Sequence, residues 1–340
     1  GPAYYLHVLA ERKRGKKLKR SVCAALFAVS GLICWCGISQ VISNSVSSAF
    51  ENAFHVPPLA TTVVLTLLAA LIVLRKNATV KSLDFIVPVM AVCYFVITVG
   101  IVVLNLRQLP AVLARIFAEA FGLRQVAAGG FGAVLMNGVK RGLFSNEAGM
   151  GSAPNVAASA DVTHPVKQGL IQTLGVFTDT LVICTCTAFI ILFSGVASTK
   201  EANGIKLTQM ALNNEIGNIG TIYVAVAILF FAYSSILGNY YYGEANVRYI
   251  THRKWAIPIY RIAVGGMVMF GALASLELAW SLADMAMGFM TICNLIAITL
   301  LGKYAFRLLE DYRIQKRNGV KNPVFTKDRM KDIENDLECW

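Results

Sequence analysis

Residues 129–161 read GGFGAVLMNGVKRGLFSNEAGMGSAPNVAASAD, an apolar stretch whose middle carries charged and polar residues. Lys140, Arg141 and Glu147 lie within it, and glycines between positions 142 and 151 interrupt any regular helix. A bilayer offers no water to unpaired backbone groups, so a broken segment at membrane depth is tolerated only where it lines a cavity in protein. The stretch therefore predicts a discontinuous membrane helix, which is the usual place of the substrate and ion site in a secondary transporter.

The rest of the chain is also apolar. Its 340 residues are 56% hydrophobic and 15% charged, whereas about a quarter of the residues in a soluble domain are charged. Apolar runs of about 20 residues, long enough to span the hydrocarbon core, predict an all-α membrane protein with eight crossings, one of them discontinuous. The predicted crossings are residues 21–49, 57–74, 82–104, 129–160, 167–195, 219–246, 256–274 and 278–302.

Positive charge predicts the orientation of these crossings. If the N-terminus is cytoplasmic, 23 of the 31 Lys and Arg residues fall in cytoplasmic segments and 5 fall outside, as the positive-inside rule requires. Both termini are therefore expected in the cytoplasm. The expected domains are a basic cytoplasmic segment at 1–20, a transmembrane transporter domain at 21–304 and a charged cytoplasmic tail at 305–340.

Three segments outside the crossings have an amphipathic or basic character. Residues 105–125 have the apolar spacing of a helix lying on the outer membrane surface, and residues 198–217 have a weaker form of it. The basic tract at 12–20 stands directly before a membrane helix. It is therefore interpreted as an anchor that contacts anionic lipid rather than as a nucleic-acid patch.

Charged residues at membrane depth usually face a cavity or a partner. Glu147 is expected to hold the two ends of the broken helix together, with Lys140 or Arg141 as its partner. Asp179 and Asp284 also fall inside predicted crossings. The Cys and His residues show no spacing typical of zinc, haem or a catalytic triad, so neither a cofactor nor enzyme activity is predicted.

Small polar residues form a second candidate region. Ser235 and Asn239 are four residues apart and share one helix face, and hydroxyl and amide oxygens suit a hard cation such as Na⁺. The alternative, hydrogen bonding between helices, is equally favoured. Gln40 could bind a polar solute or join helices, and for Asn294 the structural role is favoured.

The segment Gly142-Leu-Phe-Ser-Asn-Glu-Ala-Gly-Met-Gly-Ser-Ala-Pro154 resembles the signature of the alanine/glycine:cation symporters, also called the sodium:alanine symporter family. Further matching stretches make the resemblance cover residues 1–305. They are Gly1-Pro-Ala-Tyr-Tyr5, His164-Pro165 with Gln168-Gly169, Asp179-Thr180 with Cys184-Thr185, and Tyr241-Tyr242-Gly243-Glu244.

The resemblance implies a LeuT-like fold of eleven membrane helices in two inverted repeats. It further implies alternating-access uptake of alanine or glycine with Na⁺, or sometimes H⁺, across a bacterial inner (plasma) membrane. The implied substrate-binding residues are Gln40, Phe144, Ser145, Asn146, Ser235 and Asn239. Ser234 and Ser235 are the implied Na⁺ ligands, and Gly142, Glu147, Gly149 and Gly151 are expected to organise the site.

Two departures from the family pattern qualify these expectations. The family usually has Trp where this chain has Asn239, so an enlarged or more polar pocket is expected. A first discontinuous helix, expected before Gly1, is not in the sequence, so the eight crossings would be the last eight of eleven. The alternatives are therefore a truncated, transport-incompetent fragment and, less favoured, an ion channel, which would have pore-lining rings.

Overall fold

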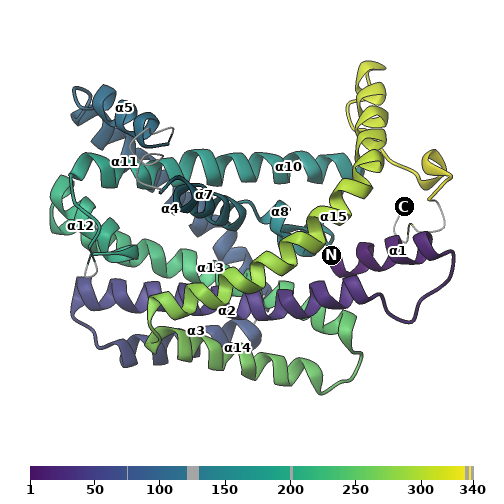
Figure 1. Ribbon diagram of the computed structural model, residues 1–340, viewed down its shortest axis with the longest axis horizontal. Coiled ribbons are helices and arrows are strands. Elements are labelled where there is room, and N and C mark those ends of the chain that lie inside the picture. Colours follow the sequence, from purple (N-terminus) through teal and green to yellow (C-terminus); the bar gives the residue numbers. More distant parts are fainter. Residues whose placement is uncertain (75, 121–129, 200–201, 334–336, 338–340) are drawn as a thin grey trace.

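The computed structural model describes residues 1–74, 76–120, 130–199, 202–333 and 337. Within these residues the regular elements are all helical (Figure 1). They are α1 (Pro2–Arg14), α2 (Val22–Phe54), α3 (Pro58–Leu74), α4 (Lys76–Leu104), α5 (Leu109–Ala120), α7 (Phe131–Ser145), α8 (Glu147–Met150), α9 (Ala153–Ala157), α10 (Pro165–Phe177), η1 (Thr178–Ile183), α11 (Cys184–Ser194), α12 (Gly204–Ile216), α13 (Asn218–Ile250), α14 (Ala256–Leu273), α15 (Leu276–Arg317) and η2 (Lys327–Met330).

The predicted all-α membrane class is confirmed. Among the described residues, six helical stretches are long and apolar enough to cross a membrane: Val22–Phe54, Phe85–Leu104, Pro165–Ser194, Asn218–Ile250, Ala256–Leu273 and Trp280–Arg317. The other two predicted crossings correspond to the shorter α3 and to the interrupted run α7–α9. The LeuT-like repeat and the truncation stay predictions.

Helix α2 is the centre of the bundle and packs against α13, α14 and α15. Small residues allow this close approach, as is usual between membrane helices: a Cβ added to Gly37 would lie 3.1 Å from the backbone of Ala283 on α15. Ser43 Oγ donates to the Val268 carbonyl at 2.6 Å, and Asn44 Nδ2 donates to the Ala274 carbonyl at 2.7 Å. Both bonds link α2 to α14, and the bond from Asn44 satisfies a carbonyl just beyond the C-terminal end of α14.

The stretch Pro165–Ser194 is one long helix that changes its winding in the middle. Residues Thr178–Ile183 form a π-helical turn, η1, between α10 and α11. π-helical turns are rare inside helices and occur frequently at functional sites. This turn lies beside α7, at the wall of the cavity described below.

The two connecting segments predicted to be amphipathic contain helices, α5 and α12. In α5, Val112 is buried in an apolar cluster with Ile190 and Leu212, so this face packs against protein. In α12, Gln209 is fully buried, and its Nε2 donates to the Ala49 carbonyl at 3.0 Å and the Thr221 carbonyl at 3.2 Å. Both helices are thus attached to the bundle.

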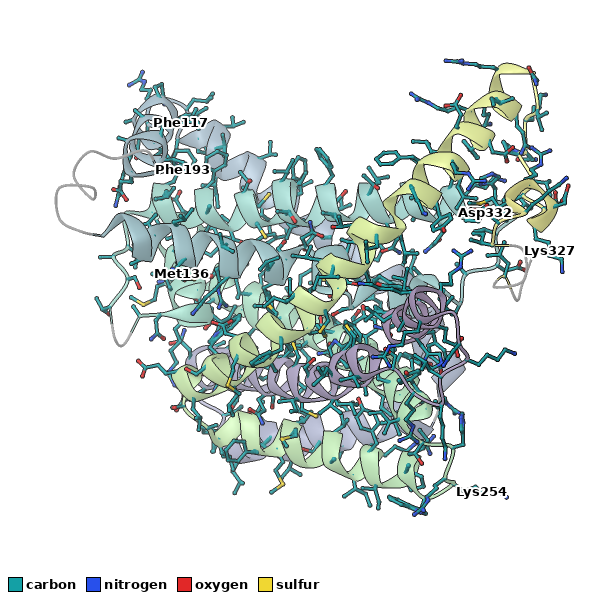
Figure 2. All side chains as sticks on the ribbon, turned by 45° about the vertical axis from the view of Figure 1, so that its right-hand side comes forward. Phe117, Met136, Phe193, Lys254, Lys327 and Asp332 are labelled. Atoms are coloured by element: carbon teal, nitrogen blue, oxygen red, sulfur yellow. The ribbon has the colours of Figure 1, made fainter. Side chains whose placement is uncertain are left out.

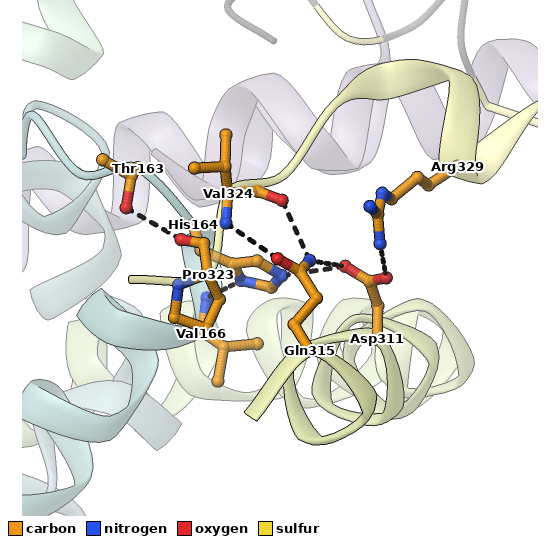
Figure 3. Close-up of polar contacts among 8 residues, drawn as sticks. All are labelled: Thr163, His164, Val166, Asp311, Gln315, Pro323, Val324 and Arg329. Carbon is orange, nitrogen blue, oxygen red and sulfur yellow. Dashed lines mark hydrogen bonds and ion pairs between the residues drawn. The ribbon is translucent and has the colours of Figure 1, made fainter. Parts of the chain in front are cut away.

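The predicted boundary between the membrane domain and the charged tail lies inside α15, which continues to Arg317. The chain then folds back on α15 (Figure 3). Gln315 Nε2 donates to the Val324 carbonyl at 2.9 Å, and its Oε1 accepts from Val324 N at 3.0 Å. His164, fully buried, lies 3.2 Å from Asp311, whose carboxylate also pairs with Arg329.

The two ends of the chain meet at one end of the molecule. Arg12 donates to Tyr304 Oη at 2.6 Å and also to the Asp332 carbonyl. Arg307 pairs with the Asp332 carboxylate at 2.8 Å, and this hydrogen bond holds the pKa of Asp332 below its ordinary value. Figure 2 shows Lys254, on another loop, at the same end of the molecule. Residues 1–20, the loop at Lys254 and the segment after residue 304 thus lie toward one end of the molecule.

Candidate functional site

The helix predicted to be broken is interrupted twice, and local chemistry explains both interruptions. Helix α7 ends at Ser145, and the Asn146 side chain accepts from Gly149 N at 3.3 Å, which caps α8. At Gly151 the chain takes φ +96°, a conformation in which residues with a Cβ are strained. A Cβ there would also lie 2.9 Å from both Asn294 and Phe27.

Neighbouring helices satisfy the polar groups that the interruption frees. Asn294 on α15 is fully buried, and its Nδ2 donates to the carbonyls of Ala148 at 3.0 Å and Gly149 at 2.9 Å. Its Oδ1 accepts from the Tyr5 hydroxyl. The structural role favoured for Asn294 from the sequence is therefore confirmed, since freed backbone groups at membrane depth need partners inside the protein.

A cavity of about 610 Å³ lies where the interrupted helix meets α2, α10, η1 and α13. Its volume is within the range of small-molecule sites. The lining residues are Ile38, Ile42, Phe144, Ser145, Glu147, Met150, Ala153, Gln172, Gly175, Val176, Asp179, Cys184, Ser234, Ser235, Gly238, Asn239 and Tyr242. The cavity is thus mostly apolar, with hydroxyl, amide and carboxylate groups at its walls.

The structure brings part of the predicted site together. Of the predicted residues, those that line the cavity are Phe144, Ser145, Glu147, Ser234, Ser235 and Asn239. Asn146, Gly142, Gly149 and Gly151 shape the interruption instead, and none of them lines the cavity. The Gly142 carbonyl accepts from Asn146 N at 2.9 Å, which closes the last turn of α7.

Gln40 lies elsewhere, in the interface between α2 and α14. It is 4% exposed, and its Nε2 lies 3.0 Å from Met267 Sδ. Gln40 Oε1 has no hydrogen-bond partner among the described residues. Ile38 and Ile42 of α2 line the cavity. Residues two apart on a helix do not share a face, so Gln40 points away from it.

The prediction that Lys140 or Arg141 pairs with Glu147 is wrong. Tyr242 Oη on α13 donates to Glu147 Oε2 at 2.9 Å. Arg141 Nη2 instead donates to both carboxylate oxygens of Asp284 on α15, at 2.6 and 2.7 Å, and the guanidinium lies 4.0 Å from the Trp280 ring centre. The two side chains point in different directions, because α7 turns its charged face to α15, whereas Glu147 follows the break and faces α13.

Asn239 lies on the α13 wall of the cavity. It is 7% exposed, and its Nδ2 donates to Ser39 Oγ on α2 at 3.4 Å. Ser235 and Tyr242 flank it at helical spacing and line the same cavity. The face predicted from the spacing of Ser235 and Asn239 is therefore the face that α13 presents to the cavity.

Several lining residues were not assigned to the site from the sequence, among them Asp179 and Gln172. Asp179, in η1, accepts from Ser145 Oγ at 2.7 Å, and Gln172 lies two helical turns earlier. An ionisable residue inside a predicted crossing is itself a functional signal. For Asp179 that signal was present, but only the packing of η1 against α7 shows which group it meets.

The model of the sodium:alanine symporter family matches residues 1–327 of the chain. The chain belongs to this family. The predicted resemblance is thereby confirmed over nearly the whole sequence. The family consists of transporters, not enzymes, and its symporters couple amino acid transport to a cation.

Relatives from bacteria and an archaeon support the assignment. The probable sodium/glutamine symporter GlnT of Bacillus subtilis (strain 168) is 48% identical over 100% of this chain and 70% of that protein. The amino-acid carrier protein AlsT of the same organism is 45% identical over 100% of this chain and 71% of that protein. The sodium/alanine symporter AgcS of Methanococcus maripaludis is 35% identical over 95% of this chain and 71% of that protein.

Proposed function

We propose that this chain carries a small neutral amino acid, of the alanine or glycine type, into the cell together with Na⁺. Transport is by alternating access at the cavity beside the interrupted helix. The observation that carries the proposal is that a polar, doubly interrupted helix forms one wall of a mostly apolar cavity. Interrupted helices of this kind hold substrates and coupling ions in secondary transporters.

The charges of the cavity support cation coupling. Its described lining includes the carboxylates Glu147 and Asp179 but neither Lys nor Arg. A zwitterionic amino acid brings one ammonium and one carboxylate, so it does not offset the two carboxylates of the cavity, and uncompensated negative charge is costly away from water. A bound cation lowers this cost, so substrate and cation stabilise each other's binding. Relatives named as sodium symporters or as a sodium/proton-dependent carrier fit this requirement.

The size and polarity of the cavity favour glutamine as a second candidate substrate. The Asn239 amide and two serine hydroxyls lie on one wall, where they can bind a side-chain amide. The relative named as a probable sodium/glutamine symporter is 48% identical. Apolar residues such as Ile38 and Phe144 line the cavity with them. They would contact the aliphatic part of either substrate.

Uptake of radiolabelled alanine, glycine and glutamine into proteoliposomes tests the proposal. We expect accumulation of at least one of them with an inward Na⁺ gradient and little without it. Equal uptake without any Na⁺ or H⁺ gradient would contradict symport. Currents far above carrier rates would favour a channel, and no uptake of any amino acid would favour a transport-incompetent chain.

The substitution Asn239→Trp tests whether this position sets substrate size. The indole fills part of the cavity and removes an amide, so glutamine should lose affinity more than alanine does, on the order of tenfold. The measurement is competition of unlabelled glutamine against alanine uptake. Val226→Trp, on the exposed side of α13, adds the same side chain away from the cavity and should leave the ratio unchanged.

We further propose that the protein lies in the plasma membrane with both described ends in the cytoplasm. The support is the shared position of the basic segments at one end of the bundle (Figure 2). Residues 1–20 and the segment after residue 304 then form one cytoplasmic layer around the 21–304 membrane domain. Its exposed Lys and Arg side chains contact anionic lipid headgroups. Protease protection in inside-out vesicles tests the orientation.

A further inference from the structure

We propose that Asp179, Ser145 and Thr180 form a Na⁺ site at the junction of α7 and η1, separate from the serines of α13. The inference rests on the proposed symport, and it assigns the coupling ion to residues that the sequence does not single out for it. Ser145 was expected to bind substrate, and Asp179 and Thr180 had no assigned role. The three side chains form a cluster of oxygen ligands that meets three requirements of a cation-binding site.

The first requirement is a set of hard oxygen ligands close together. Ser145 Oγ lies 2.7 Å from Asp179 Oδ2 and 2.8 Å from Thr180 Oγ1. Hard cations prefer carboxylate, hydroxyl and carbonyl oxygens. Hydroxyl groups can rotate their protons away and offer lone pairs to an ion. The three oxygens belong to two helices, so an ion among them would fix α7 against η1.

The second requirement is further ligands from the backbone, and the end of α7 supplies them. The Gly142 carbonyl accepts from Asn146 N. Among the described residues, however, the carbonyls of Leu143, Phe144 and Ser145 accept no backbone hydrogen bond across the break. These groups carry the negative end of the α7 dipole, which favours a cation. In transporters, the C-terminal ends of interrupted helices serve as ion ligands in this way.

The third requirement is a negative charge without a competing positive side chain. The described residues contain no ion pair to Asp179, and the nearest basic residues of α7, Lys140 and Arg141, both face Asp284. Asp179 lies within an apolar stretch long enough to cross a membrane. A carboxylate there normally pairs with a cation. Asp179 therefore offers the charge that a Na⁺ site needs.

The position of the site also explains how Na⁺ binding could be coupled to substrate binding. Ser145 is the last residue of α7, and Phe144 beside it lines the cavity. Na⁺ bound between Ser145 and η1 would hold Phe144 in place at the cavity wall. Amino acid and ion would then favour the same arrangement of the interrupted helix. This linkage must be reciprocal, so each raises the affinity for the other.

Cys184 is a native reporter for the test, since its Sγ lies 3.8 Å from Ser145 Oγ. The rate of maleimide labelling at Cys184 is measured by peptide mass spectrometry, on purified protein in nanodiscs, while Na⁺ replaces choline. We expect Na⁺ to slow labelling several-fold in a saturable way. A cysteine introduced by Lys254→Cys, on the exposed loop between α13 and α14, is the internal reference and should be unaffected.

The variant Asp179→Asn removes the charge. It should raise the Na⁺ concentration that half-maximally slows Cys184 labelling by about tenfold or more, since ligand charge sets cation affinity. Asp179→Glu should retain part of the effect, which a purely structural role would not predict. Asp161→Asn, on an exposed loop, is the matched control and should behave as the wild type. If Asp179→Asn does not give monodisperse protein, Ser145→Ala and Thr180→Val test the same ligands.

Three results would overturn the site: no slowing of Cys184 labelling by Na⁺, wild-type Na⁺ dependence in Asp179→Asn, or protection by lowered pH rather than by Na⁺. The same experiments test the symport proposal independently of the ion site. Protection without amino acid uptake would keep the ion site and reject symport. Na⁺-driven uptake without protection would keep symport and reject the ion site.

Discussion

Replacing Gly271 with Ala is expected to destabilise the protein strongly, by separating α14 from α2. A Cβ at this position would lie 2.3 Å from Gln40 Cα and 2.6 Å from the Gln40 carbonyl oxygen. Both contacts are with backbone, which cannot move aside as a flexible side chain can. Overpacking of an interior costs about 1–3 kcal/mol or more. We therefore expect a lower midpoint of thermal unfolding in detergent and reduced yield from membranes.

The same helix offers a matched control for this prediction. A Cβ at Gly266 would meet nothing within 4 Å, so Gly266→Ala should be neutral or slightly stabilising, because Ala favours a helix over Gly by about 1 kcal/mol. Equal unfolding midpoints for the two variants would show that α2 and α14 do not pack as closely as described. Any loss of transport in Gly271→Ala should accompany the loss of stability.

The substitution Asn294→Leu should abolish transport and also destabilise the fold. It keeps a side chain of similar length but removes the donor to the Ala148 and Gly149 carbonyls. Leaving a buried polar group without a partner costs about 1–3 kcal/mol, and here two carbonyls and the Tyr5 hydroxyl lose their bonds to Asn294. The chain around α8 must then rearrange to find other partners, which displaces Glu147 from the cavity wall.

Two measurements separate these effects of Asn294→Leu. Thermal unfolding reports stability, and uptake per folded protein in proteoliposomes reports transport. Thr299→Val on the same helix is the control, because among the described residues Thr299 Oγ1 donates to the Leu295 carbonyl of its own helix, at 2.8 Å, and to no other helix. Normal uptake by folded Asn294→Leu would contradict the role of Asn294 in holding the interrupted helix.

Features that depend on neighbouring residues were predictable from the sequence. Apolar runs and positive charge predicted the helices and the shared side of the basic segments. The interruption followed from the glycines, and the structure locates its two turns at Asn146 and Gly151. The shared face of Ser235 and Asn239 followed from helical spacing. In each case the signal is the composition or the spacing of residues within continuous segments of the sequence.

The partners of the charged residues were not predictable in this way. Glu147 meets Tyr242, 95 positions later, and Arg141 meets Asp284, 143 positions later. Gln40 was expected in the pocket from the family resemblance, yet its side chain turns toward α14. Asp179 joins Ser145 only because a π-helical turn packs against the end of α7.

The sequence by itself determined that the chain is a bundle of membrane helices, one of them discontinuous, and its signature segment determined its family. Hydropathy and backbone preference act over short distances, so they can be recognised in a linear sequence. Only the tertiary structure decided which carboxylate faces which hydroxyl, and which residues enclose the cavity. Those pairings depend on how each helix is rotated against its neighbours, and many small packing contacts along the whole bundle fix that rotation.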